Sequence, residues 1–355
     1  MRRRIDYIIM SELIWALRVI GPRRLLKLIR AQRLGWVGII SGFYTTRAMQ
    51  VLFQVGFFDE LRRDSPVDVA MFAKTNDLDA EILQALCDYL DALRILKRED
   101  AGYVLDSKGH LLTEYGRGWF FGVYGYEGVF HSLDKLLAKE KVYGRDITKR
   151  VDFVARGSEE MENWIYFPLA IDMIRSNKFS KVLDLGCGEA TFLTSLCEAI
   201  SSVDGYGIDI EPGPVTVGRE KIARAGLQNR VSLHVGDFTC LDNIPIQWQD
   251  IDVMTAFFVL HEILYRGADY LVTVLGKFRT RFPGVPLIVL DVIKPASEEL
   301  RRRPGMAAQY ILHHELTHQK LTSIDEWQNL FQSAGFASIE MQYASFARTA
   351  IFTLA

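Results

Sequence analysis

Residues 181–197 constrain the fold more than any other part of this 355-residue chain. Residues 182–185 are typical of a short buried strand, Gly186 and Gly188 then interrupt it, and residues 190–197 indicate a helix. A strand, a glycine turn and a helix form the first crossover of a doubly wound α/β domain. Glycines let the backbone approach a ligand closely, and the N–H groups of the following helix face that ligand. We therefore expect a ligand site at this turn.

Two later motifs narrow the kind of ligand. The dinucleotide fingerprint needs a third glycine where this chain has Thr191, so a pyrophosphate is disfavoured. Asp209 stands near the end of the next predicted strand, about twenty positions on, which suits a ribose diol. A third predicted strand, residues 231–238, ends in Gly-Asp-Phe, and the carboxylate of Asp237 suits the exocyclic amine of adenine. The alternative is a nucleotide-binding domain of another sort.

Together these motifs resemble the class I S-adenosylmethionine-dependent methyltransferases, which carry D-L-G-C-G, an acid ending the second strand and G-D-F ending the third. The resemblance implies that the methionine part of the cofactor lies beside the two glycines, the ribose at Asp209 and the adenine at Asp237. It implies this cofactor-binding set: Asp184, Gly186, Gly188, Asp209, Ile210, Gly236, Asp237 and Phe238.

The composition of the chain limits its domain number, its binding partners and its cellular compartment. Its length predicts two domains, and 49% hydrophobic residues allow substantial cores. A net charge of −2 gives no general attraction to nucleic acid or to an anionic membrane. The basic start, residues 2–4, imitates a signal peptide, but Asp6, Glu12 and Arg18 interrupt the apolar run. Four scattered cysteines indicate reduced thiols in a cytoplasmic protein: Cys87, Cys187, Cys197 and Cys240.

The first third of the chain has a helical pattern. Residues 1–45 indicate helices with basic positions, and we prefer packing on the chain or on a partner subunit to a membrane-surface role. Three more helices and a hairpin of residues 95–98 and 103–105 then resemble a winged helix. Such a module can bind DNA, but its third helix would present acids that repel phosphate. These acids are Asp79, Glu81, Asp88 and Asp91.

This order of domains is similar to that of the bacterial and plant small-molecule O-methyltransferases. The resemblance implies a Rossmann-like doubly wound α/β domain behind a mainly helical winged-helix dimerisation domain. We expect the dimerisation domain at residues 1–120, a connecting segment that contributes to the substrate cavity at 121–165, and the catalytic domain at 166–355. Ser158 is expected to cap a helix. The partners implied are a small-molecule substrate and a second copy of the chain, without nucleic acid or membrane.

His261 is the first candidate on the substrate side. It follows the fourth predicted strand, residues 251–257, and ligands bind beyond the carboxyl ends of parallel strands. In the O-methyltransferases the matching segment is V-L-H-D, and its histidine is the general base that takes a phenolic proton. An imidazole has a suitable pKa for this role near neutral pH.

The chain then departs from that family. The O-methyltransferases carry a glutamate that orients the base, and its place here falls at about Leu321. Just before it, three of the seven histidines fall within six residues: His313, His314 and His318. Together with His261 they suggest a metal. Residues 314–318 also match H-E-x-x-H, the zinc metalloprotease helix. We reject that activity because of the surrounding methyltransferase motifs, but the spacing predicts that His314 and His318 share one helix face.

A closer resemblance is to the branch that methylates the carbon next to the keto group of 2-oxo acids, such as aryl pyruvates, in natural-product biosynthesis. There, two histidines hold a metal ion that binds the substrate. In this chain they correspond to His261 and either His313 or His314, with Glu262 as a further candidate and iron or zinc as the metal. The metal would polarise the keto oxygen and acidify the adjacent C–H. The catalytic set is then His261, Glu262 and His318, where Glu262, His318 or a tyrosine removes the proton.

Metal-assisted C-methylation of a 2-oxo acid is therefore the leading prediction. O-methylation of a phenolic or other hydroxyl acceptor, with His261 as general base, is the alternative. A non-catalytic winged-helix regulator is a distant third. The substrate side chain, the metal, the true base and the choice between His313 and His314 stay open.

Overall fold

The computed structural model describes residues 14–355 except Ala16, Leu34, Asp64, residues 244–249 and residues 346–347. The basic start of the chain and the acids Asp6 and Glu12 therefore lie outside the described residues. The chain divides into two compact units, Met1–Phe120 and Phe121–Ala355. The segment 121–165, expected as a connection, falls within the second unit.

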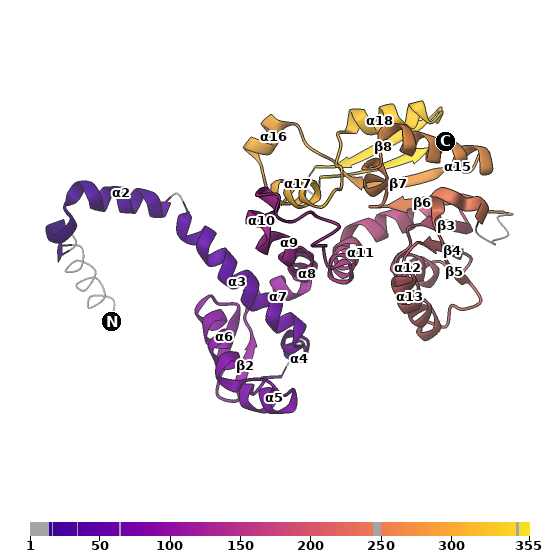
Figure 1. The fold of residues 1–355 in the computed structure, drawn as a ribbon. Helices are drawn as coiled ribbons and strands as arrows, with labels where there is room; N and C mark the ends of the chain where they lie inside the picture. The colour runs from indigo at the N-terminus through magenta and orange to yellow at the C-terminus, as the bar shows by residue number, and fades with distance from the viewer. Residues whose placement is uncertain (1–13, 16, 34, 64, 244–249, 346–347) are drawn as a thin grey trace. The chain divides into compact units, whose positions relative to one another are not determined.

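The first unit is mainly helical (Figure 1). Asp68 and Asp79 begin two of its helices, because their carboxylates accept hydrogen bonds from the backbone N–H groups of the first turn. The predicted hairpin is present, and its register pairs Leu96 with Leu105. The elements are α2 (Pro22–Arg33), α3 (Trp36–Gln54), α4 (Phe57–Leu61), α5 (Val69–Thr75), α6 (Ala80–Ala92), β1 (Leu96–Glu99), β2 (Gly102–Leu105) and α7 (Ser107–Tyr115).

The second unit is built on a seven-stranded sheet with the order β5-β4-β3-β6-β7-β9-β8. The first five strands are parallel, and β9 runs antiparallel to both β7 and β8. The predicted α/β class is thereby confirmed. The strands are β3 (Lys181–Leu185), β4 (Asp204–Asp209), β5 (Val231–Val235), β6 (Val253–Phe257), β7 (Leu287–Val292), β8 (Ile339–Ala344) and β9 (Thr349–Leu354).

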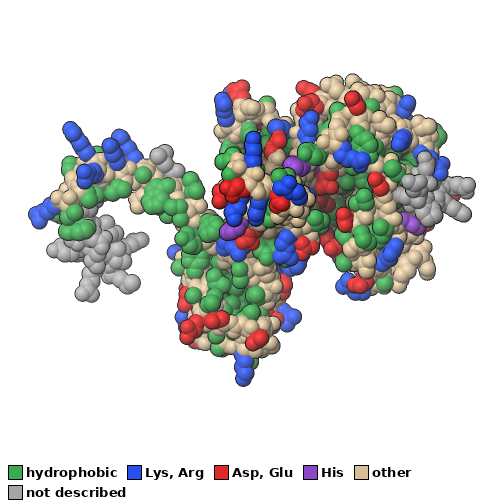
Figure 2. Space-filling view, viewed as in Figure 1, with side chains coloured by type: hydrophobic (Ala, Val, Ile, Leu, Met, Phe, Trp, Pro, Cys, Tyr) green, Lys and Arg blue, Asp and Glu red, His purple; other side chains and the backbone are tan. Residues whose placement is uncertain are grey.

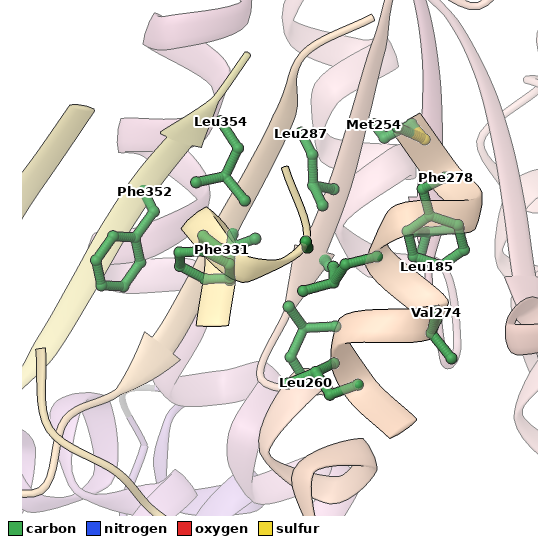
Figure 3. Packing of buried hydrophobic residues seen from close by; sticks show 14 of the residues in the cluster. Leu185, Met254, Leu260, Val274, Phe278, Leu287, Phe331, Phe352 and Leu354 are labelled. Atoms are coloured by element: carbon green, nitrogen blue, oxygen red, sulfur yellow. The ribbon is translucent and has the colours of Figure 1, made fainter. Parts of the chain in front are cut away.

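Helices cover both faces of this sheet, which explains why its central strands are continuous apolar runs. On one face α15 and α18 supply Phe278 and Phe331, which pack with Leu287 and Phe352 of the strands (Figure 3). On the other face α11, α12 and α13 pack through residues such as Phe192. The helices are α8 (Arg117–Gly125), α9 (Glu127–His131), α10 (Leu133–Leu137), α11 (Val151–Ser176), α12 (Thr191–Ala199), α13 (Pro212–Arg224), α14 (Leu260–Leu264), α15 (Ala268–Arg281), α16 (Ser297–Arg302), α17 (Ala307–Leu316) and α18 (Ile324–Ser333), with a 3₁₀ segment η1 (Phe238–Asn243).

One predicted helix start was wrong. Ser158 was expected to cap a helix, but α11 already begins at Val151 and runs through both Ser158 and Pro168. Side chains of α11 such as Phe167 and Ile174 are buried in the core on the face of the sheet that α11, α12 and α13 cover. This packing outweighs the weak local preference of serine for a helix cap. Among the residues that the structure describes, no helix is long and apolar enough to cross a membrane.

Candidate active site

The turn between β3 and α12 is held by backbone hydrogen bonds. The N–H groups of Gly186 and Cys187 donate to the carbonyl of Ile208, at 2.8 and 3.0 Å. Gly186 has φ 77°, and a Cβ atom there would lie 2.9 Å from Cγ2 of Val259. The glycine is therefore required both by the left-handed backbone and by the close approach of the segment that follows β6.

The acids of the next two strands lie at the same edge of the sheet. One carboxylate oxygen of Asp209 accepts a hydrogen bond from the N–H of Gly188, and the other from the N–H of Glu211, both at 2.9 Å. The N–H of Gly236 donates to the carbonyl of Asp209 at 2.8 Å, and Asp237 accepts from Thr239. Because β5, β4 and β3 are neighbours in that order, the three motifs converge at one end of the sheet.

The remaining members of the expected cofactor set differ in burial. Phe238 is buried, whereas Ile210 is exposed. Asp184 is buried on β3 and accepts a hydrogen bond from Thr255 Oγ1 at 2.6 Å. Burial raises the pKa of Asp184 to about 7, with the hydrogen bond from Thr255 opposing and the charge of Asp209 adding to the shift.

A second acid, Glu162 of α11, lies close to Asp184 and was missed by the sequence reasoning. Burial, followed by the charges of Asp184 and Glu159, raises the pKa of Glu162 to about 8. Two acids whose ionisation is disfavoured lie beside the glycine turn, so this part of the site favours a cation. An acid on the sheet-facing side of a helix is a sequence feature that could have identified it.

A cavity of about 380 Å³ opens beside the glycine turn. Lys221 of α13 crosses it, with Nζ at 2.8 Å from Glu159, 2.7 Å from Glu189 and 3.0 Å from Thr191 Oγ1. This lysine therefore ties α11, the glycine turn and α12 together. The cavity is lined by Asp152, Phe153, Arg156, Glu159, Glu160, Glu189 and Lys221.

His261 is fixed by a buried carboxylate. Its Nδ1 lies 2.8 Å from Oδ1 of Asp291 at the end of β7, and its backbone N–H donates to the other oxygen at 3.2 Å. Because an ionised carboxylate only accepts hydrogen bonds, Nδ1 carries a proton and Nε2 keeps its lone pair in the neutral ring. Burial alone would lower the pKa of His261, but the charge and hydrogen bond of Asp291 outweigh it and raise the pKa.

His314 of α17 lies next to this histidine. Its Nδ1 is 2.7 Å from the backbone carbonyl oxygen of Tyr310, which again leaves Nε2 as the free lone pair. The ring centroids of His261 and His314 are 5.1 Å apart at an interplanar angle of 67°. Burial, and then the charges of His261 and His313, lower the pKa of His314 to about 2, so it is neutral at physiological pH.

The other two histidines of the cluster have different surroundings. His313 stacks on Tyr126 with centroids 4.2 Å apart, and its Nε2 is buried without a hydrogen-bond partner in the described part of the chain. The prediction that His314 and His318 share a helix face was wrong, because α17 ends at Leu316 and His318 has φ 58°. His318 is exposed and stacks on Tyr265, with centroids 5.1 Å apart.

Gln319 joins the histidines to Glu262. Its side-chain Nε2 donates to Oε1 of Glu262 at 2.6 Å and lies 3.5 Å from Nε2 of His261. The same oxygen of Glu262 is 3.2 Å from Nζ of Lys149, and the carboxylate side chain is 48% exposed. Gln319 itself is buried, so the sequence offered no indication of its place beyond its nearness to the histidines.

The two imidazoles fit a metal ion by their chemistry and spacing. Both donate Nδ1–H to an oxygen acceptor, the arrangement that orients histidine ligands in metalloproteins. Two imidazole ligands at about 2.0–2.1 Å from one tetrahedral ion have ring centroids roughly 5 Å apart, close to the observed separation. Among residues 14–355, apart from the gaps given above, no group of three or more His, Cys, Asp or Glu side chains is arranged to hold a metal. A metal ion at this place would therefore have these two imidazoles as its protein ligands.

Comparison with known proteins agrees with the fold and with the three motifs at the ends of β3, β4 and β5. Residues 176–335 match the family model of a methyltransferase domain. The chain is 28% identical over 304 residues to 2-ketoarginine methyltransferase of Streptomyces arginensis, covering 83% of this chain and 86% of that protein. It is 24% identical over 309 residues to methyltransferase ungE' of Aspergillus campestris, covering 82% and 88%. Human N-acetylserotonin methyltransferase has the same fold, with a TM-score of 0.65 at 17% identity over 91% of this chain and 97% of that one.

Residues 176–335 therefore form a methyltransferase domain, and the chain is an S-adenosylmethionine-dependent methyltransferase. Its fold is that of the small-molecule O-methyltransferases with a helical N-terminal unit. The distant alternative, a non-catalytic regulator, is set aside by this result.

Proposed function

We propose that the enzyme methylates the carbon next to the keto group of a small 2-oxo acid in natural-product biosynthesis, with the help of one metal ion, iron or zinc. The observation that carries the proposal is the pair of buried imidazoles, His261 and His314, each of which is left with an Nε2 lone pair. The name of the relative from Streptomyces arginensis supports the substrate class, because 2-ketoarginine is a 2-oxo acid.

His261 and His314 would hold the metal, in preference to His313. The ring of His314 faces that of His261 at 5.1 Å, whereas His313 stacks on Tyr126. When bound, the metal would act as a Lewis acid that lowers the pKa of the C–H next to the keto group. Asp291 orients His261, and the carbonyl of Tyr310 orients His314.

Glu262 is the base that the geometry favours for removing the substrate proton. It follows His261 directly on α14 and contacts Gln319 and Lys149, so its carboxylate is held beside the histidines. His318, the other predicted base, is exposed, stacks on Tyr265 and meets the ring of Tyr143 edge to face. The proton would pass to Glu262, and the deprotonated carbon would take the methyl group that S-adenosylmethionine supplies, with S-adenosylhomocysteine as the leaving group.

For the cofactor we propose the roles that the family resemblance implies. Gly186 and Gly188 would face the methionine part, Asp209 the ribose and Asp237 the adenine, flanked by Asp184, Ile210, Gly236 and Phe238. The convergence of these residues at the ends of β3, β4 and β5 supports this assignment. Glu162 and Asp184 together favour the positive charge that the sulfonium and ammonium groups bring.

The test combines metal analysis with a substrate screen. We expect roughly one iron or zinc per chain in the wild type and its loss in His261→Ala and His314→Ala, whereas His318→Ala keeps it. The wild type should methylate 2-oxo acids at carbon, measured by mass spectrometry and NMR of the product. A wild type that binds neither metal after reconstitution would overturn the proposal.

O-methylation remains the second candidate because of the pair formed by His261 and Asp291. The chain lacks the expected glutamate near Leu321, but Asp291 orients His261 in the way that such an acid would. His261 could then take the proton of a hydroxyl acceptor. Activity on phenols that survives removal of metal by a chelator would favour this candidate over the first.

We further propose that the enzyme is a cytoplasmic homodimer that pairs through a winged-helix N-terminal unit. Hydrophobic side chains gather along α2 and α3 (Figure 2), and a contiguous exposed apolar surface is typical of a site of protein association. The exposed set is Leu26, Leu28, Trp36, Val37, Ile39, Ile40, Phe43 and Tyr44. Light scattering should give a dimer for the wild type and a monomer for the double substitution Ile39→Glu and Phe43→Glu.

A further inference from the structure

We propose that Gln319 is a gate of the metal site: its amide covers the lone pair of His261 in the metal-free enzyme and has to turn away when the ion binds. This inference rests on the metal site proposed above. It assigns to Gln319 a positioning role, setting how tightly and how fast the metal is taken up.

The contacts of the amide fix its orientation. An ionised carboxylate only accepts hydrogen bonds, so the group 2.6 Å from Glu262 is the NH₂ of Gln319. The amide oxygen accepts from the hydroxyl of Thr317 at 3.1 Å and from that of Tyr126 at 3.4 Å. The carboxylate of Glu262 therefore fixes the orientation of the amide, and the two hydroxyls, which can donate or accept, are compatible with it.

This orientation directs an N–H group at the metal-binding atom of His261. The amide Nε2 lies 3.5 Å from Nε2 of His261, and the first of its two hydrogens is used by Glu262. Because Asp291 holds a proton on Nδ1, the facing nitrogen of His261 presents a lone pair in the neutral imidazole, which is the form that binds a metal. One lone pair serves one partner, so the amide and a metal ion compete for it.

Opening the gate also changes Glu262. When the amide of Gln319 turns away, Glu262 loses a charge-assisted hydrogen bond and keeps Lys149 as its partner. Its carboxylate is then released beside the metal-bearing histidine, where the proposed reaction needs a base. Loading of the metal and release of the base are thus coupled through one buried side chain.

The experiment measures metal binding directly. Zn²⁺ and Fe²⁺ are titrated into the metal-free full-length protein against a coloured chelator, for the wild type and for Gln319→Leu. Loss of one competing hydrogen bond should make binding roughly fivefold tighter, and uptake faster, in Gln319→Leu. Gln332→Leu, on the exposed side of α18, makes the same chemical change away from the site and should match the wild type.

A second variant tests the gate without touching the amide. Thr317→Val removes a hydroxyl that holds the amide oxygen, and it should shift metal affinity in the same direction by a smaller factor. If Gln319→Leu does not fold, Thr317→Val still allows the test. Thermal unfolding of each metal-free protein will show whether it is folded.

The outcomes separate this inference from the proposed function. If the wild type, Gln319→Leu and Thr317→Val bind metal equally, and His261→Ala abolishes binding, the metal site stands and the gate is wrong. If Gln319→Leu binds metal more tightly than the wild type does, the gate is supported. If none of the variants binds metal, both the gate and the metal mechanism are overturned.

Discussion

Asp291 and His261 form a buried pair in which Oδ1 of the carboxylate lies 2.8 Å from Nδ1 of the imidazole. The two residues come from different elements, the end of β7 and the start of α14, which adjoin because β6 and β7 are parallel neighbours. Their contact fixes both the ring orientation and the tautomer of His261, whichever of the two proposed reactions it serves.

Asp291→Asn should therefore lower metal affinity or kcat without unfolding the protein. The amide can donate as well as accept, so it no longer enforces a proton on Nδ1 of His261. We expect a loss of roughly 10–100-fold in metal affinity or in kcat, the usual effect of changing a residue that orients a histidine ligand. Asp250→Asn, at an exposed ion pair with Lys181, is the matched control. Unchanged metal affinity and kcat in Asp291→Asn would contradict this role.

Asp209→Ala should weaken cofactor binding selectively. Its carboxylate ties the tip of β4 to the N–H of Gly188 and would also receive the ribose hydroxyls. Hydrogen bonds to a charged group are worth about 1.5–3 kcal/mol, so the Kd for S-adenosylhomocysteine should rise by roughly 10–100-fold in calorimetry. The KM for the methyl acceptor should change little.

The opposite end of the same strand provides the comparison for Asp209. Asp204→Asn alters an acid whose carboxylate lies 3.9 Å from Nε of Arg230, away from the glycine turn. Equal weakening of cofactor binding in both variants would mean that Asp209 acts through the stability of β4 and not through contact with the ligand.

The sequence predicted the elements that depend on local patterns. Continuous apolar runs predicted the parallel strands, and the glycine turn with its two acids predicted motifs that converge at one edge of the sheet. The start of α18 depends on a similar local pattern, since Ser323 and Glu326 form a capping box. These features involve neighbours in the chain or a repeated supersecondary unit.

Contacts set by sheet order and helix ends were not readable from the sequence. Asp291 was the single acid in residues 287–292, yet its partner follows from the register of β6 and β7. Gln319 and His318 lie just after α17, and their positions depend on the helix ending at Leu316. The H-E-x-x-H spacing therefore led to the wrong prediction for His314 and His318, because residues four apart share a face only within a continuous helix.

Glu162→Gln should change how stability depends on pH. The pKa of Glu162 is raised from 4.5 to about 8, so between these values the folded state holds a proton that the unfolded chain has lost. This contribution to stability is fully present below about pH 4.5 and is lost as the pH rises through about 8. Relative to Glu162→Gln, the wild type should lose up to about 1.4 kcal/mol per pH unit across that window.

Urea unfolding at pH 5.5, 7 and 8.5 would measure that difference. Comparing the two proteins cancels the opposite trend from His313 and His314, whose lowered pKa values make the folded state lose stability as the pH falls below about 6.5. Parallel pH profiles of the wild type and Glu162→Gln would show that Glu162 is ionised normally in the folded state.

Gly186→Ala should destabilise the protein and impair cofactor binding for two separable reasons. Its φ of 77° costs an L-residue about 1–2 kcal/mol, and its new Cβ would lie 2.9 Å from Cγ2 of Val259. The double variant Gly186→Ala with Val259→Ala removes the second reason and leaves the first. Chemical unfolding should therefore show the double variant regaining part of the stability that Gly186→Ala loses, after correction for Val259→Ala alone. If the effects of the two substitutions simply add, the close contact with Val259 does not limit this position, and the backbone conformation alone requires the glycine.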